Sequence, residues 1–118
     1  MAFGLIVVAC MVGGACNMEA PMMYGGGAAQ EECGAARKTE ILDGMRDVLG
    51  GGLPGGLTRG DHNAIIPITD ALRARRVDRL ILRCVEWTGS GTPRRGRTVG
   101  EDVYRREQLN ELFGARRP

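Results

Sequence analysis

The chain has 118 residues, of which 43% are hydrophobic and 25% charged, and its formal net charge is +2. This length allows one small domain at most, and the glycines have no three-residue period, which excludes a collagen. No stretch reaches about 20 strongly apolar residues, which excludes a bundle of membrane helices.

Residues 1–36 are rich in glycine, alanine and methionine, and we expect them to form a leader or a linker. Within them, residues 5–9 are a short, β-branched run followed by glycines, which is typical of a buried strand. The alternative is an export signal with residues 14–16 as a lipoprotein-like cleavage site, although no basic residue precedes the apolar run. The expected location is therefore cytoplasmic, or exported if residues 1–16 act as a signal.

The four cysteines, Cys10, Cys16, Cys33 and Cys84, contain no C-x-x-C pair, and His62 is the single histidine. A structural zinc site of the usual spacing is therefore not supported. Disulfides are expected only if the chain is exported.

Residues 37–91 follow the order strand, helix, strand. A short apolar run at 41–42 ends at Asp43, a helix capped by Asn63 carries apolar residues at helical spacing, and residues 80–85 form an apolar strand. Pro67 is tolerable in that helix only within its first turn. This order predicts a βαβ unit with a parallel sheet.

Three carboxylates, Asp43, Asp47 and Glu86, follow the two expected strands. Ligands gather at the carboxyl ends of parallel strands, so these residues form a candidate site at one sheet edge. The alternative is that each is a solvated loop acid or a helix cap.

Several segments carry a resemblance to a known family. Residues 41–48, I-L-D-G-M-R-D-V, resemble the opening strand and D-x-Q-N-D-F motif of the isochorismatase-like hydrolases, particularly the nicotinamidases. Residues 55–58, 65–72 and 80–87 resemble later segments of that family in the same order. The resemblance covers less than half of the chain, and it implies an α/β fold with a partial, incomplete three-layer parallel sheet.

The resemblance also implies roles for individual residues. Asp43 matches the acid that orients and deprotonates a nucleophilic cysteine, and Asp47 and Val48 fall in the substrate pocket. Glu86 matches the aspartate of the family's divalent metal site, and His62 is the other candidate ligand.

The implied metal site is incomplete in this sequence. Thr88 stands where the family has a metal-binding histidine, so a divalent metal would lack its full ligand set. The family's catalytic lysine and cysteine belong to later segments that the sequence does not show. The first predicted function is thus an incomplete or diverged nicotinamidase-like amidohydrolase acting on a small carboxamide, weak or inactive as this chain alone.

Residues 92–118 form an arginine-rich tail with an expected helix, which would begin with a capping box at 98–101 and end near Gly114. Clustered arginines at 94–97, 105–106 and 116–117 predict a second function, that of a small non-catalytic protein that binds nucleic acid or an acidic partner. A solvated basic face is the alternative for this segment.

Overall fold

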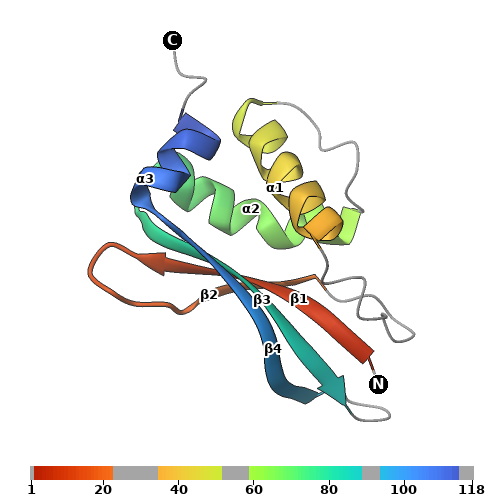
Figure 1. The fold of residues 1–118 in the computed structure, drawn as a ribbon. Coiled ribbons are helices and arrows are strands. Elements are labelled where there is room, and N and C mark those ends of the chain that lie inside the picture. The colour runs from red at the N-terminus through yellow and green to blue at the C-terminus, as the bar shows by residue number, and fades with distance from the viewer. Residues whose placement is uncertain (1, 23–34, 52–58, 89–93, 115–118) are drawn as a thin grey trace.

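The computed structural model describes residues 2–22, 35–51, 59–88 and 94–114. They form a four-stranded antiparallel sheet in the order β2-β1-β3-β4, and the helices lie on one face of it (Figure 1). The elements in chain order are β1 (Ala2–Met11), β2 (Met18–Met22), α1 (Ala35–Leu49), α2 (Arg59–Arg73), β3 (Val77–Thr88), β4 (Arg94–Arg105), α3 (Arg106–Leu109) and the π-helical turn η2 (Asn110–Gly114).

Strand β1 lies in the interior of the sheet, between β2 and β3. Successive side chains of a strand point to opposite faces of the sheet. Each of residues 5–10 is at most 2% exposed, so both faces of β1 are covered. A continuous apolar run suits a strand that is covered on both faces. The strand interpretation of residues 5–9 therefore agrees with the structure.

The parallel sheet expected from the sequence is wrong. Strand β3 pairs antiparallel with β1, with Leu5 opposite Cys84, and the run at 41–42 that was expected to be a strand lies inside α1. Ile41 and Met45 are both fully buried and one helical turn apart, with Val48 following at the next turn. This spacing presents one apolar face of a helix to the sheet, so the three-layer isochorismatase-like architecture is not formed.

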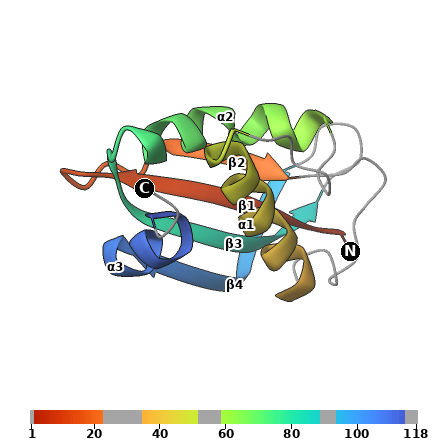
Figure 2. The same cartoon turned by 90° about the horizontal axis from the view of Figure 1, so that it is seen from above.

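Helix α2 forms where a helix was expected, but it begins at Arg59, which places Pro67 in its interior rather than in its first turn. Pro67 has no N–H to donate to the carbonyl of Asn63, and both residues are exposed. Water can reach that carbonyl, which explains how the helix continues past the proline. Viewed from above, α2 lies along β2 while α1 crosses the sheet (Figure 2).

Residues 94–105 are strand β4, although a helix was expected to begin near Thr98. Leu80 lies opposite Tyr104 and Cys84 opposite Gly100, and Val99 is then an extra residue that forms a bulge. Helical structure begins only at Arg106 and ends at Gly114. Within the described residues β4 is an edge strand, because it pairs with β3 alone.

The main core lies between the sheet and the helices. It contains Leu5, Val7, Leu80 and Leu82 from the sheet, and the helices cover them with a set of buried side chains that includes Ile41, Met45, Ile65, Ile68 and Leu109. On the opposite face a smaller buried cluster consists of Ile6, Val8, Cys10, Ile81 and Val85. None of the helices in the described ranges is long and apolar enough to cross a membrane.

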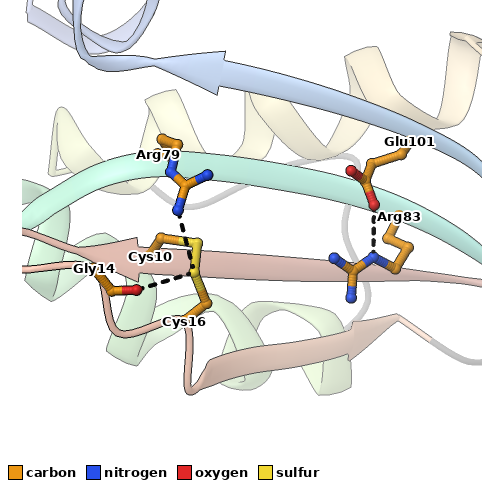
Figure 3. Close-up of a disulfide and its surroundings, with 6 residues drawn as sticks. All are labelled: Cys10, Gly14, Cys16, Arg79, Arg83 and Glu101. Carbon is orange, nitrogen blue, oxygen red and sulfur yellow. Dashed lines mark hydrogen bonds and ion pairs between the residues drawn. A yellow bond between two sulfur atoms is a disulfide. The ribbon is translucent and has the colours of Figure 1, made fainter.

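A disulfide joins Cys10 at the end of β1 to Cys16 in the turn before β2 (Figure 3). Cys10 is fully buried in the smaller cluster, whereas Cys16 is exposed. Arg79 on β3 donates a hydrogen bond to Cys16 Sγ at 3.6 Å, and on the same face Arg83 Nε lies 2.9 Å from Glu101 Oε2. Cys84 is buried and is also disulfide-bonded.

Candidate functional site

The structure distributes the predicted site residues over three elements. Asp43, Asp47 and Val48 lie on α1, His62 lies near the start of α2, and Glu86 lies within β3. Asp43 and Asp47 are exposed, one turn apart on the helix, while Val48 packs against the main core. The expected edge with three carboxylates depended on a strand at 41–42 and on parallel pairing, neither of which the structure contains.

Two of these acids have arginine partners. Asp43 Oδ1 lies 3.1 Å from Arg46 Nη1 on the same helix, and Glu86 Oε1 lies 3.0 Å from Arg97 Nη2 across the β3–β4 pair. In the part of the chain that the structure describes, no three His, Cys, Asp or Glu side chains form a group that could hold a metal ion. Glu86 is thus paired with Arg97, whereas His62 is half-buried near the start of α2 and belongs to no such group in the described ranges.

A different site is formed by the ends of the helices. A cavity of about 750 Å³ lies between the C-terminal ends of α1 and α2 and the α3–η2 segment. Its apolar walls are Leu49, Leu72, Val77, Leu109 and Phe113, and its charged side chains are Arg46, Arg73, Arg75 and Arg106. No acidic residue lines it among the described residues. We call this site the arginine cleft.

Hydrogen bonds to the backbone hold two of the four arginines in place. Arg46 donates from Nε to the carbonyl oxygen of Leu112 at 3.0 Å, and Arg73 donates from Nη2 to the carbonyl oxygen of Val48 at 3.1 Å. These bonds satisfy carbonyl groups at helix ends, where positive charge is also favourable. A guanidinium has five N–H donors, so each arginine keeps donors for a bound group.

Acidic partners outside the cleft restrain the arginines further. Arg46 pairs with Asp43, and Arg73 Nη1 lies 3.3 Å from Asp70 Oδ1. Arg106 Nη2 lies 3.5 Å from Asp78 Oδ1. Because these pairs are partly exposed, each contributes little to stability, but together they limit the directions in which the guanidinium groups can point.

Arg75 differs from the other three, because no ion pair in the described ranges holds its side chain. It follows α2 with a φ of 59°, in the left-handed region. The Arg75 N–H donates to the carbonyl oxygen of Leu72 at 3.0 Å, and the Arg76 N–H donates to that of Ala71 at 2.9 Å. This is the Schellman arrangement of a helix end, and Arg75 occupies the position at which glycine is usual.

Most of the arginine-rich tail is not at the cleft. Of the predicted cluster, Arg106 lines the cleft, Arg105 is exposed at the end of β4, and Arg97 is paired with Glu86. The side chains of Arg94 and Arg95, and residues 116–117, lie outside the described residues. The signal in the sequence that could have pointed to the cleft is the R-x-R-R spacing of residues 73–76 after an apolar helix.

Comparison with known proteins gives no match to a family model, to a curated protein or to a solved structure.

Proposed function

We propose that the protein is a small non-catalytic interaction protein that binds an acidic partner in the arginine cleft. The observation that carries this proposal is Arg75. An arginine in the left-handed conformation costs about 1 kcal/mol relative to the glycine that this position favours. Local strain of this kind is concentrated at functional positions. Here it occurs at an arginine that has no ion pair in the described ranges and that lines a cavity with three other arginines.

The shape and lining of the cleft favour a segment of polypeptide as the partner. A cavity of about 750 Å³ is within the size range of sites that take small ligands and short segments, and its walls are apolar. An acidic segment with interspersed apolar side chains would bury the latter against Leu72 and Phe113 while its carboxylates accept hydrogen bonds from the arginines. A nucleic acid duplex, by contrast, presents phosphates on a broad convex surface.

The amidohydrolase function remains a prediction that no comparison tests. The segment that carries its proposed catalytic acid, Asp43, is helical, and the acid is exposed and paired with Arg46. We therefore base the proposal on the cleft.

The test is binding of a short fluorescein-labelled peptide of alternating glutamate and leucine, measured by fluorescence anisotropy. Arg75→Gly should weaken binding about tenfold or more, because one charge-assisted hydrogen bond is worth about 1.5–3 kcal/mol. The same substitution should raise the free energy of unfolding by about 1 kcal/mol, because glycine relieves the left-handed strain. A variant that binds less while becoming more stable separates loss of a ligand contact from loss of structure.

Arg76→Gly is the matched control. It removes the same charge from the next residue, which is exposed and does not line the cleft in the described ranges, so binding should change little. Equal losses of affinity in Arg75→Gly and Arg76→Gly would show that only net charge matters, and would overturn the proposal that the arginine cleft is the binding site. Tighter binding of a DNA duplex than of the peptide, unaffected by Arg75→Gly, would instead favour nucleic acid as the partner.

We infer further that the protein works in an oxidising compartment. This corresponds to the second location expected from the sequence, in which the chain is exported. Cys10 is bonded to Cys16, and Cys84 is disulfide-bonded as well. Such bonds form and persist mainly outside the reducing cytosol. Mass spectrometry of unreduced protein isolated from its native compartment should detect the Cys10–Cys16 cross-link, and free thiols at both residues would contradict this location.

A further inference from the structure

We propose that the protein forms a two-fold symmetric dimer in which the outer edge of β4 pairs with β4 of a second copy. This surface is independent of the arginine cleft. β4 is a strand of 12 residues with one paired edge among the described residues. An open edge exposes backbone N–H and C=O groups that can pair with another strand. Two of the three large hydrophobic residues that are exposed in the described ranges, Val99 and Val103, lie on this strand.

Symmetry limits the possible pairings. A two-fold axis perpendicular to the sheet makes two edge strands antiparallel and keeps the helices of both copies on the same side. Side chains alternate between faces, so opposite residues must then both be odd-numbered or both even-numbered in the regular part of the strand. That part runs from Gly100 to Arg105, between the bulge at Val99 and the start of α3.

Charge complementarity selects one register among these. A register centred on Glu101, Asp102 or Arg105 places that charged side chain directly opposite its own copy, which is unfavourable. Registers centred on Gly100 or on Tyr104 extend into the bulge or into α3. The register centred on Val103 avoids both problems.

In this register the side chains that meet across the axis are complementary, although Glu101 and Asp102 also have partners within the monomer, Arg83 and Lys38. Val103, 36% exposed in the monomer, lies opposite Val103 of the second copy, and Glu101 lies opposite Arg105 on both sides of the axis. Arg105 is exposed and makes no ion pair in the part of the chain described, so its guanidinium is available. On the helix face Asp102 lies opposite Tyr104, whose hydroxyl can donate to a carboxylate.

Charge reversal tests the register. Sedimentation velocity of the full chain should show a concentration-dependent dimer. Arg105→Glu places two pairs of carboxylates opposite each other and should weaken association about tenfold or more, and Glu101→Arg should do the same with two pairs of arginines. An equimolar mixture of the two variants restores Glu–Arg pairs at every position, so it should dimerise although neither variant does so alone.

Arg76→Glu controls for net charge, because it changes an exposed residue away from β4 and should leave the dimer intact. Circular dichroism confirms that each variant is folded. A wild-type chain that stays monomeric at all accessible concentrations overturns the proposal. A dimer that tolerates Arg105→Glu, or variants that fail to associate when mixed, overturns the register.

Discussion

Arg46 on α1 donates a hydrogen bond from Nε to the carbonyl oxygen of Leu112 at 3.0 Å, and so connects residues 66 positions apart in the chain. The same guanidinium pairs with Asp43 at 3.1 Å. The bond joins the second half of α1 to η2, the last described element. Arg46 is therefore a polar attachment of the C-terminal segment beside the Arg106–Asp78 pair, and the buried Leu109 attaches the segment to the core.

Replacing Arg46 by alanine should release η2 more than it destabilises the whole domain. We expect a loss of about 1–2 kcal/mol, since one hydrogen bond from a charged donor is removed. Hydrogen–deuterium exchange should accelerate at residues 110–114 and stay near wild type in β1. Asp43→Asn, which leaves the Leu112 bond intact, is the control. Uniform acceleration throughout the chain in Arg46→Ala would contradict a local role.

Gly96 and Gly100 on β4 should respond differently to alanine. A Cβ at Gly96 would lie 3.1 Å from both the Cβ and the carbonyl oxygen of Glu86, whereas one at Gly100 would meet nothing closer than the Cys84 Cβ at 3.9 Å. Gly96→Ala should cost about 1–2 kcal/mol through overpacking, and Gly100→Ala should be neutral or stabilise by up to about 1 kcal/mol. Urea denaturation measures both; equal effects would contradict the tight approach at Gly96.

Tyr104 should make stability depend on alkaline pH. Partial burial, followed by the charge of Asp102, raises the pKa of Tyr104 above 10.0, while Lys38 acts in the opposite direction. The folded state thus favours the neutral phenol, and this contribution is complete below pH 10 and is lost as the pH rises through the folded-state pKa. The melting temperature of the wild type should fall more steeply above pH 10 than that of Tyr104→Phe. Tyr24 is the only other tyrosine, so the difference in absorbance between the two proteins isolates the Tyr104 titration. Identical dependence of the melting temperature on pH in the two proteins would refute the raised pKa of Tyr104.

The Cys10–Cys16 disulfide should resist reduction in the native protein. An external thiolate can reach the exposed Cys16, but its attack would expel the Cys10 thiolate into the apolar cluster with Ile6 and Ile81. Burial raises the pKa of a thiol and makes it a poor leaving group. Peptide mapping after dithiothreitol treatment should find this bond intact until denaturant is added. Rapid reduction without denaturant would be inconsistent with this burial.

Removing that disulfide should cost about 2 kcal/mol, since the loop that it closes is short. Cys10→Ala/Cys16→Ala is the informative variant, because it leaves no thiol in the buried cluster. Its thermal unfolding midpoint should fall relative to the wild type in the absence of reductant. An unchanged midpoint would show that the hairpin hydrogen bonds alone, such as Met11 N–H to the Ala15 carbonyl at 2.7 Å, are sufficient.

The sequence allowed prediction of α2 and β3 and of a strand at residues 5–9, because each has a clear apolar pattern and flanking turn residues. It misled at Ile41, where two adjacent apolar residues suggested a strand although Met45 and Val48 continue a helical period. It also misled at Thr98, where a pattern typical of a helix cap lies in β4. Pairing with β3 outweighs that local preference, and only the tertiary structure reveals it.

The arginine cleft could not be predicted from local patterns. The residues that line it come from the ends of α1, α2 and the α3–η2 segment, and they are spread along the chain from Arg46 to Gly114. The left-handed φ of Arg75 also depends on how α2 ends. The predicted site residues Asp43 and Glu86 were placed at one edge only because parallel pairing was assumed. Because the strands are antiparallel and residues 41–42 are helical, none of the three carboxylates lies at the expected edge.

The position of β1 has a consequence for biosynthesis. This apolar strand is translated before β3 and can pair with β2 at once, but its longer pairing with β3 requires residues 77–88. Contacts between such distant segments form slowly, because the intervening chain must first be closed into a loop. Until β3 has been synthesised, we expect β1 to be exposed and prone to aggregation. Ribosome-bound chains that stop before Val77 should therefore recruit chaperones, and chains that include β3 should not.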